Sequence, residues 1–235
     1  MRVLDASSSI YRGLAWRLAS TDLAVLRSHV TKDFADTAHT VLAWANVNAA
    51  NAMPRLLDAT DASIARAGLR ITDYRRPTWS KDGSALYVGL RRTTSDYVGL
   101  RQREPAADQP KKSDDKVSDV EIWHTNDVHE IPEPRSAEQR DARASMLAVW
   151  HVGDKMVMQI GSDVAETSAV LDGDAYATET DRKLYAFGQK FGRRDQDLWV
   201  IDLTSGVRRK VLTKVRYYFG ADPTGKRLSW FDGHD

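Results

Sequence analysis

The chain has no cysteine among its 235 residues. This absence excludes a disulfide framework and any zinc site built on thiolates. It does not locate the protein, because reducing and oxidising compartments both tolerate a cysteine-free chain. A formal net charge of +1, with both signs interspersed, also leaves no basic face for nucleic acid. We therefore expect no nucleic-acid partner.

Long apolar runs are missing as well. The longest uncharged stretch, residues 37–54, is diluted by asparagines, threonines and a histidine, so it is a poor candidate for a membrane span. Asp5 and three serines interrupt the first ten residues, which therefore lack the apolar core of a signal peptide. We expect a soluble protein with no membrane partner, and the sequence does not determine its compartment.

What the chain does contain is a phrase that occurs three times: an apolar residue, six mostly polar or turn residues, and a leucine that opens an apolar run. The apolar residue and the leucine seven positions later are Trp16 and Leu23, Trp79 and Leu86, and Ala221 and Leu228. The gap between the second and third copies is more than twice the gap between the first two. This spacing predicts an array of like units with one degenerate copy in the wide gap.

Turn signals lie inside these phrases at Asp82-Gly83 and at Thr224-Gly225. Glycine reaches positive φ, and Asp or Thr can bond the local backbone, so each phrase is typical of strand, tight turn, strand. Further hairpins are predicted over residues 41–57, 146–160 and 198–212. Two hairpins per unit form a four-stranded antiparallel sheet, the architecture of a propeller blade.

The predicted fold is all-β, an incomplete β-propeller of about three and a half four-stranded antiparallel blades. The blades are expected at residues 10–60, 74–160, 166–213 and 216–235, with residues 168–171 and 174–179 as the degenerate hairpin and the last blade truncated. Such a chain is expected to be a piece of a longer protein or an open array with an exposed edge. The alternative is a β-sandwich of similar hairpins, because repeats alone do not determine closure.

Two departures from the strand pattern lie within the second blade. Residues 101–117 are rich in charge, proline and alanine and have no apolar period, which predicts a solvated loop insertion. The segment that begins at Ser136 has the form of a capping box and predicts a short helix through about Ala144.

Four stretches carry a resemblance to a known family: residues 11–17, 75–83, 120–124 and 197–206. Together they resemble the N-terminal β-propeller of the prolyl oligopeptidase family of bacterial serine peptidases. The resemblance spans nearly the whole chain and lies in the order and spacing of the stretches, because many propellers share single Ser-x-Asp-Gly phrases. It implies a longer parent protein in which the propeller covers the active site of a C-terminal α/β-hydrolase domain and admits only peptide substrates.

The catalytic machinery of that family is not found in this sequence. A nucleophile elbow needs Gly-x-Ser-x-Gly, and no serine of the chain stands in that pattern. Where relatives continue Trp-His-Trp-Lys-Asp, residues 123–127 read Trp-His-Thr-Asn-Asp. The expected function is therefore a non-catalytic, substrate-gating propeller segment without catalytic residues or cofactor. The alternative is a free-standing module that binds a protein or peptide on the propeller face or at its open edge.

Other chemistry-bearing groups favour ordinary structural roles. Potential metal ligands gather at His124, Asp127, His129 and Glu130. Their spacing differs from the His-Glu-x-x-His of metalloprotease helices, so a loop without metal is expected. Residues 187–194 lack the ending of a phosphate loop and are expected to form a hairpin loop. Turns and strand edges are the expected positions of Asp195, Asp197 and Asp202. Residues 208–210 are expected to form a solvated strand end.

Overall fold

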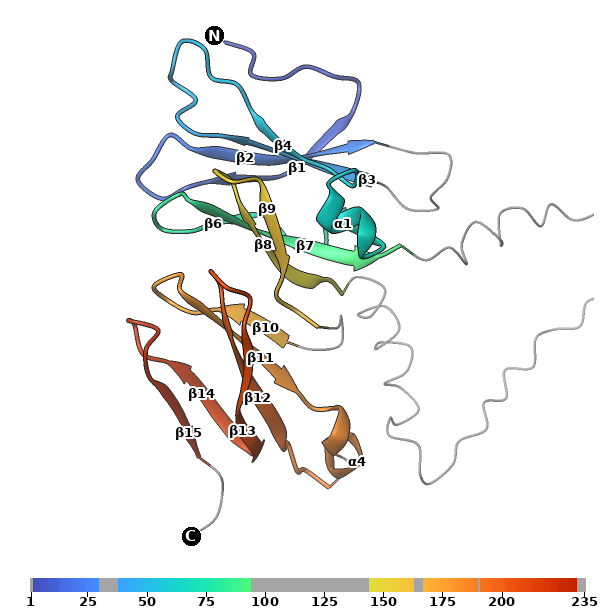
Figure 1. Ribbon diagram of the computed structural model, residues 1–235, viewed down its shortest axis with the longest axis vertical. Helices are drawn as coiled ribbons and strands as arrows, with labels where there is room; N and C mark the ends of the chain where they lie inside the picture. The colour runs from blue at the N-terminus through green and yellow to red at the C-terminus, as the bar shows by residue number, and fades with distance from the viewer. Residues whose placement is uncertain (1, 30–37, 94–143, 163–166, 190, 232–235) are drawn as a thin grey trace, which may run out of the picture.

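The computed structural model describes residues 2–29, 38–93, 144–162, 167–189 and 191–231. Four antiparallel sheets follow one another along its long axis, in chain order from the N-terminal to the C-terminal end (Figure 1). The first sheet contains β1 (Ile10–Trp16), β2 (Leu23–His29), β3 (Ala38–Trp44) and β4 (Arg55–Leu57), paired in that order.

The other sheets repeat this plan with variations. The second sheet is formed by β5 (Leu69–Thr72), β6 (Thr78–Trp79), β7 (Ala85–Arg92), β8 (Met146–His151) and β9 (Met156–Gln159). The third sheet is formed by β10 (Thr167–Val170), β11 (Tyr176–Asp181), β12 (Gln196–Asp202) and β13 (Arg208–Val215), and the fourth by β14 (Tyr217–Ala221) and β15 (Leu228–Phe231). Short helices are α1 (Ala62–Arg66), η1 (Lys183–Tyr185) and α4 (Ala186–Gln189).

The first hairpin of every sheet ends on an equivalent residue pair. These pairs are Trp16 with Leu23, Trp79 with Leu86, Val170 with Ala177, and Ala221 with Leu228. The turn after Trp79 is closed by a backbone bond from Ser80 N–H to the Ala85 carbonyl (2.9 Å) and one from Gly83 N–H to the Ser80 carbonyl (3.1 Å), and the other three turns have equivalent bonds. The third sheet thus contains a fourth copy of the hairpin, in which smaller apolar residues replace tryptophan and leucine.

The apolar core lies between successive sheets, and the two faces of β7 belong to two different parts of it. Leu86, Val88 and Leu90 belong to the cluster shared with the first sheet, whereas Ala85 and Tyr87 belong to the cluster shared with the third. A strand covered on both faces needs apolar residues at consecutive positions, which explains why β7 shows no polar alternation. The outer face of the first sheet is covered by its own N-terminal segment and by the loop before β4, through Leu4, Val47 and Ala52.

The expected all-β fold, an incomplete β-propeller, is confirmed, and the described sheets do not close into a ring. One difference is the strand number of the second sheet. Residues 69–72, which precede the expected boundary, form β5 and pair with β7 beyond the end of β6. The expected sheet of four strands therefore has five.

The helices also differ from expectation. Helix α1 was not predicted, and its N-cap Asp61 accepts a bond from Ser63 N–H at 3.0 Å. Helix α4 occupies part of the stretch that was expected to be a loop without helix. No helix of the described ranges combines the length and apolar character needed to cross a membrane.

Several sequence expectations concern residues that the structure does not describe. They are the insertion at 101–117, the helix from Ser136 onward, and the metal-ligand candidates His124, Asp127, His129 and Glu130. These stay predictions.

Candidate functional site

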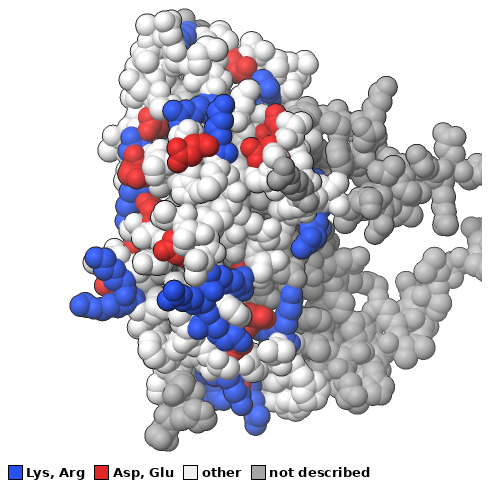
Figure 2. Space-filling view, in the orientation of Figure 1, with Lys and Arg blue, Asp and Glu red and all other residues white. Residues whose placement is uncertain are grey.

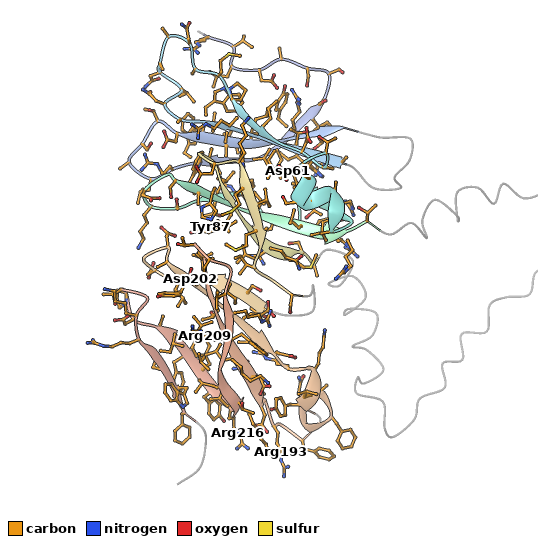
Figure 3. All side chains as sticks on the ribbon, viewed as in Figure 1. Asp61, Tyr87, Arg193, Asp202, Arg209 and Arg216 are labelled. Carbon is orange, nitrogen blue, oxygen red and sulfur yellow. The ribbon has the colours of Figure 1, made fainter. Side chains whose placement is uncertain are left out.

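Two adjoining hollows lie at the seam between the second and third sheets. Their volumes are about 310 and 420 Å³, and both are lined by Lys81, Tyr87 and Asp174. Lys81 comes from the β6–β7 turn, Tyr87 from β7 and Asp174 from the β10–β11 turn. Figure 3 places Tyr87 on the side of the second sheet that faces the third.

Asp174 holds this seam together. Its carboxylate accepts a bond from Lys81 N–H at 2.6 Å and another from the Tyr87 hydroxyl at 3.0 Å. Its φ of 55° is left-handed, a conformation that aspartate tolerates better than most residues. Burial, and then the neighbouring Asp174 charge, raise the pKa of the Tyr87 phenol, so Tyr87 remains a hydrogen-bond donor. Nearby, Lys81 Nζ lies 3.3 Å from Asp172 Oδ1.

The smaller hollow is also lined by two arginines. Burial lowers the pKa of the Arg75 guanidinium, and the buried Arg75 Nε has no hydrogen-bond partner in the described part of the chain. Arg76 donates to the backbone carbonyl of Leu14 on β1. Asp172 and Asp174 also line this hollow, so its positive side chains are accompanied by two carboxylates.

The larger hollow contains the residue types of a catalytic triad, but not its geometry. Ser80 Oγ and Ser84 Oγ both bond the Asp82 carboxylate, at 2.7 and 2.8 Å. His151 Nε2 instead lies 3.0 Å from the Leu203 carbonyl of the third sheet. In a triad the imidazole must bridge carboxylate and hydroxyl. The bonds from Ser84 and Ser80 lower the pKa of Asp82 and close a turn.

A second polar cluster, centred on Glu179, crosses the same seam and was missed from sequence. The buried Glu179 carboxylate of β11 pairs with Arg208 Nη2 of β13 at 2.6 Å. It also accepts bonds from Ser162 N–H (2.7 Å) and Ser162 Oγ (2.5 Å), which follow the last strand of the second sheet. The Arg208 guanidinium stacks 4.5 Å above the Trp199 ring. Arg208 is therefore a seam residue rather than part of a solvated strand end.

Asp197 is also not the edge residue that was expected. It is 1% exposed and bonds Lys210 Nζ (2.5 Å), the Tyr185 hydroxyl (2.7 Å) and Lys214 N–H (2.9 Å). Burial alone would raise the pKa of Asp197, but these bonds outweigh it and lower the pKa. The bond to Asp197 in turn raises the pKa of Tyr185 to about 12. No local pattern predicts this cluster, because its members come from three separate elements, η1, β12 and β13.

The other two aspartates that were expected at turns and strand edges, Asp202 and Asp195, differ from each other in burial. Asp202 is the last residue of β12, at the start of the turn, and accepts bonds from Thr204 N–H (2.9 Å) and Ser205 N–H (2.8 Å). Asp195 is instead buried beside Arg216, at 3.4 Å.

The residues of the repeated phrase are distributed over the hairpins rather than gathered in one site. Trp79 is buried, and its Nε1 donates to the Ala15 carbonyl of the first sheet at 3.2 Å, whereas Trp16 is 54% exposed. Gly83 and Gly225 adopt φ values of 78° and 70° in their turns. The phrase therefore marks structural positions, and the seam residues Tyr87 and Asp174 lie beside it.

Comparison with known proteins gives fold matches only. No protein-family model and no curated protein matches the chain. An orthorhombic form of Pyrococcus horikoshii acylaminoacyl peptidase matches with 11% identity and a TM-score of 0.32, over 94% of this chain and 34% of that one. The β-propeller domain of the Trilobed protease from Pyrococcus furiosus matches with 10% identity and a TM-score of 0.33, over 97% of this chain and 69% of that one. The chain thus spans about a third of that acylaminoacyl peptidase, and the likeness concerns the β-propeller fold alone.

Proposed function

We propose that the chain is a non-catalytic, substrate-gating segment of the β-propeller of a prolyl-oligopeptidase-like serine peptidase. The proposal rests on the four stretches that resemble that family, on the stacked sheets, and on a sequence without Gly-x-Ser-x-Gly. The observation that carries it is the row of turns along one edge of the stack, in which each turn contacts the turn of the next sheet.

The links in this row connect each sheet to the next. Arg17 Nη1 of the first sheet donates to the Lys81 carbonyl at 3.0 Å, and Lys81 N–H donates to Asp174 of the third sheet. Between the third and fourth sheets, Gly225 packs directly against the backbone of Asp172. Lysines, arginines and acidic side chains lie side by side on the face shown in Figure 2. In the proposed parent, these turns form one wall of the chamber that peptide substrates enter.

The proposed partner is a C-terminal α/β-hydrolase domain in a longer parent protein, which supplies the serine, aspartate and histidine. A peptide substrate meets this chain only as one wall of the chamber in the parent. Each sheet is proposed to be one blade, with boundaries near those expected from the sequence.

The test begins with the reading frame that follows residue 235 in the native gene, where we expect a hydrolase domain. The parent should cleave a short chromogenic peptide but spare unfolded casein, whereas its hydrolase domain alone should cleave both. A stop codon with no hydrolase domain, or equal cleavage of casein by the parent, contradicts the proposal. The isolated 235-residue chain should not react with a fluorophosphonate, and stoichiometric labelling would contradict its non-catalytic role.

The second candidate is a free-standing interaction module. It is favoured by one observation, the edge of β15, which pairs with β14 only among the described strands. Strand addition at such an edge is a known mode of peptide recognition. A stoichiometric partner that the isolated chain retains, and that a Leu228→Lys variant releases, would support this candidate over the first.

A further inference from the structure

Two Asp-Gly turns meet at the seam between the second and third sheets, and the bonds around them differ. One is Asp82-Gly83 in the β6–β7 turn, and the other is Asp172-Gly173 in the β10–β11 turn. Asp82 and Gly173 line the larger hollow, and Asp172 lines the smaller one. A third Asp-Gly pair, at residues 232–233, lies outside the described residues. Because the first two share a dipeptide, they isolate the effect of their surroundings.

The Asp-Gly dipeptide is open to a reaction between a side chain and its own backbone. The glycine amide nitrogen attacks Cγ of the aspartate, an N–C bond forms, and water leaves, which closes a five-membered succinimide ring. Glycine favours this step because it has no side chain to block the approach. Water then opens the ring at either carbonyl and gives aspartate or isoaspartate. One water is lost and one is regained, so the reaction needs no oxidant, cofactor or enzyme.

Both reacting groups of the Asp82-Gly83 turn are held by hydrogen bonds. Gly83 N–H donates to the Ser80 carbonyl at 3.1 Å. The Asp82 carboxylate accepts bonds from Ser80 Oγ (2.7 Å), Ser84 N–H (2.9 Å) and Ser84 Oγ (2.8 Å). The Ser84 and Ser80 bonds lower the pKa of Asp82, and an ionised carboxylate is attacked less readily than a carboxylic acid. Ring closure here requires that these bonds break first.

The Asp172-Gly173 turn lacks these restraints. The Asp172 side chain is 64% exposed, and its ion-pair partner, Lys81 Nζ at 3.3 Å, belongs to a side chain that is 69% exposed. An exposed pair of this kind contributes little and opens readily. Gly173 N–H has no hydrogen-bond acceptor among the residues that the structure describes. Neither the attacking nitrogen nor the attacked carboxyl is therefore held as in the Asp82-Gly83 turn.

We propose that Asp172-Gly173 is a site of spontaneous isoaspartate formation in the folded chain, from which its neighbour Asp82-Gly83 is protected. In the product, the main chain runs through Cβ and Cγ of residue 172 and is one carbon longer. The former main-chain carbonyl becomes a free carboxylate. The proposal concerns the chemistry of one turn and does not rest on the peptidase proposal.

The position of this turn gives the modification a structural consequence. The Asp172 carbonyl oxygen packs directly against Gly225, and a Cβ built on Gly173 would lie 2.9 Å from the Thr224 carbonyl oxygen. A longer main chain and a new charge both disturb this close contact between the third and fourth sheets. The fourth sheet should therefore become more weakly attached as the chain ages.

The test follows isoaspartate at both turns of the same molecule. The folded chain is incubated near neutral pH for several weeks and then digested with trypsin, which places the two turns in separate peptides. Methylation by a purified protein L-isoaspartyl methyltransferase measures isoaspartate in each peptide, and electron-transfer fragmentation locates it. The rate at Asp172 should exceed the rate at Asp82 by at least about tenfold, because attack at Asp82 first requires the loss of several hydrogen bonds.

Unfolding supplies the matched control. In urea the bonds around Asp82 are absent, so the two turns should form isoaspartate at similar rates. Asp172→Glu keeps the charge but would need a six-membered ring, so it should remove the signal from that peptide. After incubation, amides of residues 217–231 should exchange faster in the unchanged chain than in Asp172→Glu.

The outcomes separate clearly. A folded chain without isoaspartate at Asp172, or with equal rates at the two turns, overturns the proposal. A fully modified chain whose residues 217–231 exchange as slowly as those of the incubated Asp172→Glu variant overturns the structural consequence.

Discussion

At the scale of single residues, buried carboxylates hold neighbouring strands together through hydrogen bonds and ion pairs, in addition to apolar packing. Glu179 is fully buried, yet Ser162, Ser168 and Arg208 donate hydrogen bonds to it. A buried charge is tolerated only when such partners replace its water. Removing either the charge of Glu179 or its hydrogen-bond partners should therefore lower the free energy of unfolding.

This cost can be measured against an exposed pair in the same chain. We expect Glu179→Gln to lower the free energy of unfolding by roughly 2–4 kcal/mol, because Arg208 loses its buried anion. The control is Asp172→Asn, which breaks the exposed pair with Lys81 and should cost about 0–1 kcal/mol. Urea denaturation measures both, and equal costs would contradict the role assigned to Glu179.

The Asp197 cluster predicts a pH dependence. Its bonds hold the pKa of Asp197 below 3.8, so its contribution to stability is complete above that pH and is lost as the pH falls through the lower folded pKa. The difference in unfolding free energy between the unchanged chain and Asp197→Asn should be constant from about pH 5 to 7 and shrink below about pH 4. A difference that stays constant down to about pH 2 would contradict the assigned shift.

At the scale of elements, the turns of the first hairpins determine how closely the sheets approach. Gly225 has a φ of 70°, and a Cβ at this position would collide with the Asp172 carbonyl oxygen. Both the left-handed conformation and the backbone contact therefore require glycine. Gly153, in the β8–β9 turn, has neither constraint, since no atom lies within 4 Å of a Cβ built there.

These two glycines form a matched pair of variants. Gly225→Ala should destabilise the chain by more than about 1–2 kcal/mol and detach the fourth sheet, because strain and the collision add. Gly153→Ala should be neutral or slightly stabilising. Thermal unfolding and amide exchange of residues 217–231 measure the effect. Identical behaviour of the two variants would contradict the close approach of Gly225 to Asp172.

At the scale of the whole molecule, each sheet is stabilised by apolar contacts with the sheets next to it. The largest apolar cluster joins the first and second sheets, and the next joins the second and third. The fourth sheet has two strands and several exposed aromatic side chains. In such an array each unit depends on its neighbours, so the two-stranded end should open most easily.

Hydrogen exchange should therefore be graded along the stack. Amides of β7 and β8, in the sheet covered on both faces, should exchange slowest, and those of β14 and β15 fastest. Uniform protection across the four sheets would show instead that the array unfolds as one unit.

Local chemistry explains why much of this architecture is predictable from the sequence. The hairpin from Trp79 to Leu86 depends on its own turn residues, and the hairpin closed by Val170 and Ala177 is predictable from spacing and flanking turn residues although its apolar signature is weak. Continuous apolar runs indicate strands covered on both faces. These features involve neighbours in the chain, so the order of residues is sufficient to determine them.

The groups that meet at the seam are determined by tertiary packing instead. Tyr87 bonds Asp174 from 87 positions away, and Arg208 of β13 reaches Glu179 of β11 across the intervening strand β12. The pairing of β5 with β7 and the burial of Asp197 likewise depend on sheet stacking. The order of residues is enough to specify the repeated strand–turn–strand units, because each is stabilised locally. Their partners across sheets depend on how closely those units pack.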